Sequence, residues 1–126
     1  MLAINMILSR YEQVLLAGWE DTSKKSQLTL WILLALKESP KHMGDIRSFL
    51  HTATDGLVSA DDKSIYRALR RFNDAQLVDF VTEKNERGPD KKVYALSEIG
   101  EKVLNSYTDR NIKGLFFSAK NKHLFT

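Results

Sequence analysis

Residues 59–96 place a basic helix directly before two short strands, and this order limits the folds open to the chain. Ser59, Asp61 and Asp62 precede the helix, and their side-chain oxygens can accept hydrogen bonds from the free N–H groups of a first turn. The helix has an apolar face and a cationic face, each with helical spacing: Ile65, Leu69 and Phe72 on the first, and Lys63, Arg67 and Arg70 on the second. Such a helix can lie on a duplex while its back stays in a core.

The two strands follow this helix at once. Residues 77–82 and 92–96 are rich in β-branched and aromatic side chains, which favour strands. The turn between them, residues 85–90, contains Gly and Pro and is flanked by lysines. Helix, strand, cationic loop and strand is the order of a winged helix. The sequence therefore predicts a mainly α protein with a small β-hairpin (α+β), a winged helix-turn-helix with an added N-terminal helix.

The N-terminal third is predicted to contain two helices joined by a polar connection. Residues 1–20 repeat apolar side chains at helical spacing, and a capping box of Ser9 and Glu12 is an alternative start for this helix. Residues 21–27 are polar and are predicted to form the connection. Residues 28–37 are apolar on nearly all sides, which is typical of a core helix.

The remaining elements complete the predicted domain. Pro40 ends the core helix, and residues 41–51 are predicted to form the next one. Leu57, in the turn before the basic helix, is expected to pack back into the core. Ser97 is expected to cap a last helix, and Gly114 to break the tail that follows.

Two motifs in this arrangement resemble the PadR family of transcriptional regulators. Residues 64–72 (SIYRALRRF), followed by Leu-Val at 77–78, are similar to the recognition-helix segment of that family. Residues 88–100 (GPDKKVYALSEIG) are similar to its wing motif. The resemblance covers roughly residues 28–104. At 42–46 the order His-Met-Gly-Asp-Ile departs from the usual His-Gly-Tyr-Glu/Asp-Ile of the family.

The resemblance implies a DNA-binding regulator that acts as a homodimer. The basic helix would enter the major groove, and the wing would lie on the backbone or in the minor groove. The expected partner is double-stranded promoter DNA with a pseudo-palindromic operator, and the expected action is repression. The expected DNA-binding residues lie on the helix and the wing: Lys63, Ser64, Tyr66, Arg67, Arg70, Arg87, Lys91 and Lys92. Alternatives remain for three of them, since Tyr66 can belong to the core, and Lys91 and Lys92 can protect a strand edge, Lys92 more readily than Lys91.

Both terminal segments are predicted to serve dimerisation. Residues 1–27 form the proposed dimerisation element, 28–104 the DNA-binding domain, and 105–126 a tail packed on the N-terminal helix. The candidate interface residues are apolar: Ile4, Leu8, Tyr11, Leu15, Trp19, Trp31, Leu115 and Phe116. Many PadR relatives release DNA when a small aromatic effector binds between the subunits. Tyr11, Trp19 and Trp31 have two interpretations, an effector pocket or dimer core, and apolar residues at helical spacing favour core.

Composition excludes several other classes. The net charge is only +3, and the absence of Cys excludes disulfides and thiolate metal sites. The three histidines lack metal-ligand spacing, and no nucleotide-binding or nucleophile motif is present, so neither a cofactor nor an enzyme is expected. The longest apolar run, residues 30–36, is far shorter than the roughly 20 residues that span a bilayer, and a cytoplasmic location is expected. Two alternative functions stay open: a protein–protein interaction module and a small-molecule-binding protein without DNA function.

Overall fold

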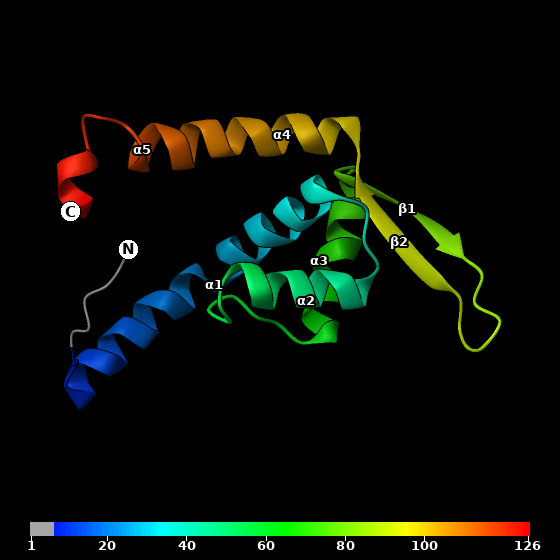
Figure 1. The fold of residues 1–126 in the computed structure, drawn as a ribbon, viewed down its shortest axis with the longest axis horizontal. Coiled ribbons are helices and arrows are strands. Elements are labelled where there is room, and N and C mark those ends of the chain that lie inside the picture. The colour runs from blue at the N-terminus through cyan, green and yellow to red at the C-terminus, as the bar shows by residue number, and fades with distance from the viewer. Residues whose placement is uncertain (1–6) are drawn as a thin grey trace.

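The computed structural model describes residues 7–126, so the predicted role of Ile4 lies outside the described residues. The helices and strands follow one another as α1 (Arg10–Glu38), α2 (Met43–Ala53), α3 (Asp62–Asp74), β1 (Val78–Glu83), β2 (Lys91–Leu96) and α4 (Glu98–Thr108). A π-helical turn (Asp109–Lys113), α5 (Gly114–Phe116) and a final 3₁₀ turn (Lys122–Phe125) complete the chain. Helices α1 to α3 gather in the centre, the β1–β2 hairpin projects from one side, and α4 runs across the top (Figure 1).

Helix α1 is continuous where the sequence predicts two helices and a connection. It begins at the alternative start, because Ser9 Oγ accepts from Glu12 N at 3.1 Å and Glu12 Oε1 accepts from Ser9 N at 2.8 Å. The predicted connection at residues 21–27 is wrong, since helix runs through it. This stretch contains neither Gly nor Pro, and Thr22 Oγ1 donates to the Trp19 carbonyl at 2.7 Å. Its polarity marks exposure to water and not the end of a helix.

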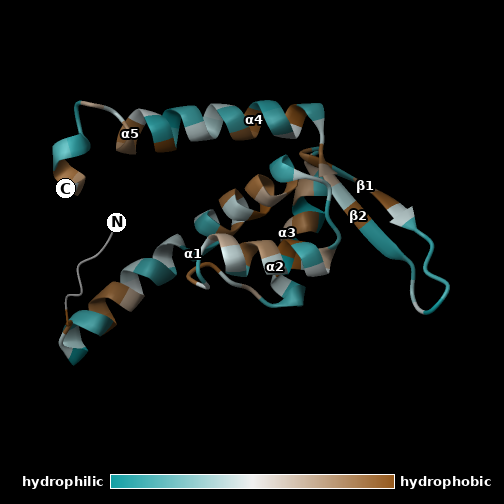
Figure 2. Cartoon of the chain, in the orientation of Figure 1, coloured by the Kyte–Doolittle hydropathy of each residue, from teal (hydrophilic) through white to brown (hydrophobic). Residues whose placement is uncertain are grey.

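The core forms where the second half of α1 meets α2 and α3, as the apolar patterns predict. Helix α1 contributes Ile32, Leu33 and Leu36, and α2 contributes Ile46 and Leu50. The predicted apolar stripe of α3 is buried in full: Ile65, Leu69 and Phe72 are at most 5% exposed. The apolar stretches of these helices turn toward one another (Figure 2). The core therefore fixes the back of α3 and leaves its cationic face outside.

The turn between α2 and α3 corrects one prediction. Leu57 does not pack into the core, because its side chain is 74% exposed. Left-handed backbone at Asp55 and Gly56 reverses the chain, and Thr54 Oγ1 then accepts from Val58 N at 3.0 Å. This closure turns Val58 toward the core and leaves its neighbour Leu57 in water.

The hairpin is joined to the helices through Lys41, which forms an isolated antiparallel β-bridge with Tyr94. In the antiparallel register Phe80 lies opposite Tyr94. Tyr94 N donates to the Lys41 carbonyl at 2.8 Å, and Lys41 N donates to the Tyr94 carbonyl at 2.9 Å. Tyr94 is buried, and burial raises the pKa of its hydroxyl. The base of the wing is thus joined to the segment that follows α1.

The junction between the hairpin and α4 is close-packed, and here the sequence predicts the helix start correctly. Ser97 Oγ accepts from Gly100 N at 2.9 Å and donates to the Gln76 carbonyl at 2.6 Å. A Cβ atom at Gly100 would lie 1.9 Å from the Leu77 carbonyl oxygen. Only a glycine lets the first turn of α4 pack this close to the backbone that leads into β1.

Gly114 does not break the tail, contrary to the prediction. The helical rod continues from α4 through the π-helical turn into α5 (Figure 1). Gly114 N donates to the Asp109 carbonyl, and a Cβ atom at position 114 would lie 2.9 Å from that oxygen. The glycine therefore accommodates the wider turn instead of ending the helix.

Candidate nucleic-acid interface

The start of α3 is held by two acidic side chains that the sequence places there as capping residues. Asp61 is the N-cap, and its Oδ1 accepts from Ser64 N at 2.7 Å. This hydrogen bond lowers the pKa of the Asp61 carboxyl. Asp62 instead forms an ion pair with Arg47 of α2. The cap and the ion pair together fix the first turn of α3 relative to α2.

The outer face of α3 carries the predicted cations. Lys63, Arg67 and Arg70 are exposed, and Ser64 is half-buried beside them. Tyr66 is 41% exposed, so it lies at the edge of the core and not within it. Within residues 7–126, none of the basic side chains of α3 has an acidic partner within 4 Å. This face therefore presents cations that form no ion pair, although the Asp61 carboxylate of the first turn lies near Lys63 and Arg67.

Arg71 is also exposed and lies one helical turn after Arg67. Its guanidinium carbon is 5.8 Å from the centroid of the Phe72 ring. No acidic residue of the described chain forms an ion pair with it.

The wing has a turn that is closed by its own side chains. Asp90 Oδ1 accepts from Asn85 N at 3.1 Å, and Asn85 Oδ1 accepts from Arg87 N at 3.1 Å. The predicted cations Arg87 and Lys91 are both exposed. The turn therefore presents positive side chains on a defined backbone.

Lys92 has a different environment from the other wing cations. Its Nζ atom lies 4.5 Å from the centroid of the Phe80 ring and 6.0 Å from that of Tyr66. These contacts place it between the wing and α3.

A groove of about 500 Å³ separates the wing from the helices, and it brings three of the predicted residues together. It is lined by His42, Met43, Gly44, Arg47, Asp62, Tyr66, Asp90, Lys91, Lys92 and Tyr94. Arg47 and His42 are absent from the sequence-based set. No spacing signal could relate Arg47 to Asp62, because they lie on different helices and meet only through the fold.

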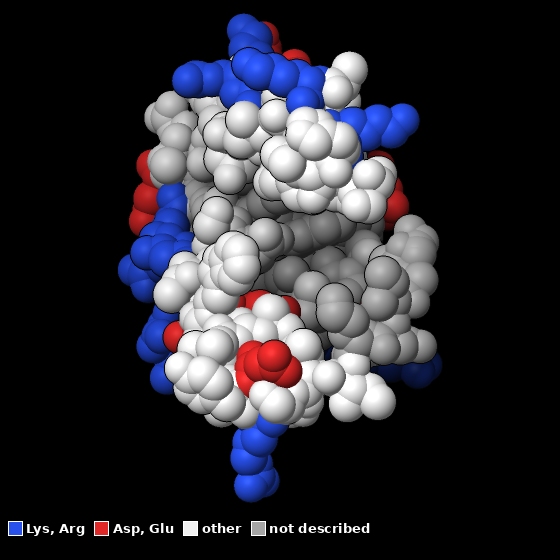
Figure 3. Space-filling model, turned by 90° about the vertical axis from the view of Figure 1, so that its left-hand side faces the viewer, with Lys and Arg blue, Asp and Glu red and all other residues white. Residues whose placement is uncertain are grey.

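The apolar residues predicted for the dimer interface are mostly exposed in a single chain. The exposed fraction is 70% for Tyr11, 54% for Leu15 and 75% for Trp19. Leu115 and Phe116 are about half exposed, whereas Leu8 and Trp31 are partly buried. Figure 3 views the end of the molecule where α1 begins and the chain finishes: the described residues there are largely uncharged, with Lys and Arg gathered mainly toward the edges and a few acidic side chains among them.

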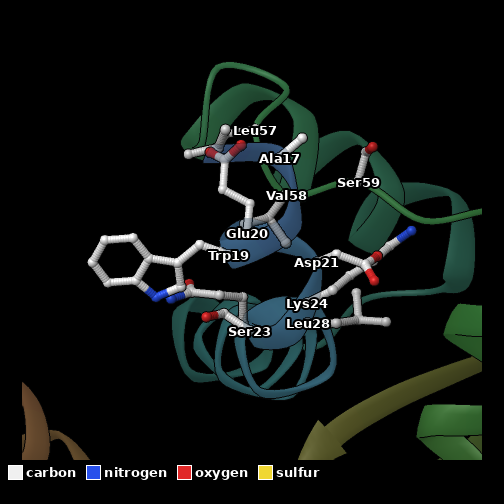
Figure 4. Close-up of a pocket in the computed structure, with 11 residues that line it drawn as sticks. Ala17, Trp19, Glu20, Asp21, Ser23, Lys24, Leu28, Leu57, Val58 and Ser59 are labelled. Carbon is white, nitrogen blue, oxygen red and sulfur yellow. The ribbon is translucent and has the colours of Figure 1, made fainter. Parts of the chain in front are cut away.

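Trp19 also borders a groove of about 460 Å³ between α1 and the α2–α3 turn. Leu57 and Leu28 line this groove as well, and Trp19 extends away from the other labelled side chains (Figure 4). Neither Tyr11 nor Trp31 reaches it. The three aromatic residues named for an effector pocket are thus not gathered in one cavity of a single chain. Trp31 instead donates its indole N–H to Gln27 Oε1 at 3.1 Å.

Comparison with known proteins agrees with this architecture. The transcriptional regulator PadR-like family matches residues 32–106 of the sequence. The chain belongs to this family. The predicted PadR resemblance and the winged-helix α+β fold are therefore confirmed. No curated protein matches the chain. In the described residues, no helix has the length and apolar character needed to cross a membrane.

Solved structures of PadR-like proteins share the fold. A PadR-like transcription factor from Bacteroides fragilis is 24% identical, with a TM-score of 0.64 over 74% of this chain and 87% of that chain. Bacillus subtilis PadR, solved in complex with operator DNA, is 26% identical, with a TM-score of 0.58 over 64% of this chain and 45% of that chain. The circadian clock associated protein Pex from Anabaena is 18% identical, with a TM-score of 0.54 over 65% of this chain and 71% of that chain, which is a likeness of fold alone.

Proposed function

We propose that this PadR-like regulator is a homodimeric repressor that binds a pseudo-palindromic operator in double-stranded DNA. The observation that carries the proposal is the set of exposed cations on the outer face of α3 that form no ion pair, next to a wing with further exposed cations. A polyanion is the partner that such a surface attracts, and displaced counterions supply much of its binding free energy. The operator DNA bound by the Bacillus subtilis relative supports the same partner. The protein has no catalytic role in this account.

Each predicted residue receives a role from its position. Arg67 and Arg70 face the major groove, where Arg can pair with guanine O6 and N7. Ser64 contacts base edges with less selectivity, and Lys63, at the first turn, contacts phosphate. The Tyr66 hydroxyl lies at the edge of this face and reaches a phosphate oxygen. Arg87 and Lys91 place the wing on the backbone or in the minor groove.

The exposed apolar end of the molecule supports the homodimer. Exposed apolar side chains occur on α1 (Tyr11, Leu15, Trp19) and on α5 (Leu115, Phe116), the start of α1 and α5 lie toward the same end of the molecule (Figure 1), and exposed apolar side chains in such number are typical of an interface. We place the aromatic residues in the dimer core and not in an effector pocket, because apolar residues at helical spacing are usually packing residues. Two-fold symmetry would then present the two α3 helices to successive major grooves, about 34–36 Å apart.

The test is a titration of the protein into labelled mixed-sequence duplex DNA, followed by fluorescence anisotropy at two salt concentrations. The double variant Arg67→Ala, Lys91→Ala is compared with Lys102→Ala, whose exposed side chain on α4 pairs only with Glu98 at 3.7 Å. We expect the wild type and Lys102→Ala to bind equally and to weaken steeply with salt, and the double variant to lose affinity. A folded wild type that ignores DNA at low salt would contradict the proposal and favour a protein partner for the winged helix.

A further inference from the structure

Lys92 lies on the face of the hairpin that is turned toward α3. Side chains alternate along a strand, so Phe80 and Thr82 share a face with their register partners Tyr94 and Lys92. Tyr94 on this face is buried, which identifies it as the inner face of the wing. Lys91 alternates to the other face of the strand, opposite its register partner Glu83, although it also borders the groove between the wing and the helices.

The ammonium of Lys92 is held between two aromatic rings that belong to different elements. Phe80 of β1 is 4.5 Å from Nζ, and Tyr66 of α3 is 6.0 Å from it. Both distances are within the range of cation–π attraction. The Phe80 and Tyr94 ring centroids lie 5.6 Å apart, and the Tyr94 backbone is bonded to Lys41. A continuous series of contacts therefore runs from the recognition helix through Lys92 to the anchored base of the wing.

Few other polar contacts connect the wing with α3. Within the described residues, no hydrogen bond and no ion pair joins α3 to β1, β2 or the turn between them. The hydrogen bonds of the turn close the turn upon itself. The angle between the wing and α3 thus depends on the short connection before β1, where Leu77 N donates to the Phe72 carbonyl at 2.8 Å, on apolar packing at the base of the hairpin, and on the contacts of Lys92.

We propose that Lys92 is a positioning residue for DNA binding, whose ammonium sets the wing on the recognition helix by stacking between Phe80 and Tyr66 and makes no phosphate contact. This inference rests on the proposed DNA-binding function. It separates Lys92 from Lys91, although the two lysines are adjacent in the sequence. Lys91 remains a phosphate contact, whereas Lys92 acts through the geometry of the wing.

The salt dependence of DNA affinity distinguishes the two roles. Loss of one phosphate contact lowers the slope of log K against log[salt] by about 0.9, whereas loss of a positioning contact weakens binding equally at every salt concentration. We therefore compare Lys92→Met with the matched variant Lys91→Met on the same duplex. We expect Lys92→Met to bind about 2- to 5-fold more weakly with an unchanged slope, and Lys91→Met to show the lower slope. Lys92→Arg should restore the affinity, because a guanidinium also stacks on aromatic rings.

A measurement without DNA keeps this inference separate from the proposed function. The ring current of Phe80 should shift the Lys92 Hε resonances upfield in the free protein, and Phe80→Leu should return them to ordinary lysine positions. Wild-type protein that fails to bind DNA would overturn the proposed function and the role of Lys92 in DNA binding, while the resonance shift would still report the stacking. If the wild type binds DNA, three results would overturn the Lys92 inference and leave the proposed function intact. These are a lower salt slope for Lys92→Met, an unchanged affinity of Lys92→Met, and an affinity of Lys92→Arg no higher than that of Lys92→Met.

Discussion

At the scale of single residues, the ammonium of Lys41 connects the end of α1 to the sheet. It is 8% exposed and donates to the Ala35 carbonyl at 2.7 Å, to Glu38 Oε1 at 3.0 Å and to Ser39 Oγ at 3.0 Å. It therefore satisfies carbonyl and side-chain oxygens at the α1 C-terminus, where a positive charge is also favoured by the helix dipole.

Lys41→Met should lower the free energy of unfolding by about 1–3 kcal/mol, because the buried Ala35 carbonyl loses a charged donor. The measurement is urea denaturation at one fixed protein concentration, since a dimer couples stability to concentration. Lys25→Met, which removes an exposed lysine of α1, is the matched control and should change stability by less than about 0.5 kcal/mol. Equal effects of the two variants would contradict the capping role.

Gly100 and Gly18 provide a second pair of matched variants at the scale of single residues. A Cβ at Gly100 would lie 1.9 Å from the Leu77 carbonyl oxygen, whereas one at Gly18 meets no atom within 4 Å. Gly100→Ala should destabilise by about 3 kcal/mol or more, because backbone must move. Gly18→Ala should stabilise α1 by about 0.5–1 kcal/mol. The Tm values of the two variants, measured by circular dichroism, should therefore move in opposite directions, and a stable Gly100→Ala would disprove the close approach.

At the scale of elements, the cap of α3 makes its stability depend on pH. The Asp61 carboxyl is charged in the cap, and its pKa in the folded protein lies below its ordinary value of 3.8. The folded state therefore binds fewer protons than the unfolded state, and the stabilisation is present above pH 3.8 and is lost as the pH falls through the folded pKa. Asp61→Asn keeps an acceptor but cannot titrate, so its denaturation midpoint should fall less steeply with acid than that of the wild type. Parallel pH profiles would refute this role.

The continuity of α1 is a second property at the scale of elements, and a proline substitution within the helix tests it. Ser26 lies in the stretch that the sequence alone suggests is a connection, but the structure places it inside the helix. Ser26→Pro should cost about 3 kcal/mol or more, since it removes a helical hydrogen bond and clashes with the preceding turn. Ser26→Ala should be neutral or slightly stabilising. Tolerance of the proline, with unchanged helicity in circular dichroism, would indicate a connection after all.

At the scale of the whole molecule, the sequence predicts the architecture well because local patterns carry it. The stripe of Ile65, Leu69 and Phe72 identifies the buried face of α3, and the two PadR-like motifs identify the wing. The sequence fails where the outcome depends on contacts between distant residues. Lys41 resembles any surface lysine until the α1 C-terminus and Tyr94 surround it. Leu57 is apolar, yet the closed turn gives the inward position to Val58.

In the candidate site, too, the features that follow from local patterns were predictable and those that depend on contacts between distant residues were not. Exposed cations on α3 follow from helical spacing, so their arrangement on one face is predictable. The ion pair of Arg47 with Asp62 and the stacking of Lys92 are not, because each joins two elements whose relative placement no local pattern contains. The DNA-contacting roles of the individual residues stay predictions that binding measurements must test.

The start of α1 and the tail lie at one end of the molecule, and the wing projects from the opposite side, with α3 between them (Figure 1). A dimer formed through that end would leave both recognition helices free. The central claim is therefore that two copies read one symmetric site.

The most direct test is selection of bound duplexes from a random-sequence pool by the wild type, with Arg67→Ala, Arg70→Ala as the comparison. We predict a two-fold symmetric sequence whose half-sites are centred about 10–10.5 base pairs, or a multiple of this, apart. The variant should lose preference at guanine positions within each half-site. A pool that shows no enrichment, or a single asymmetric site that the variant selects equally well, would contradict the account.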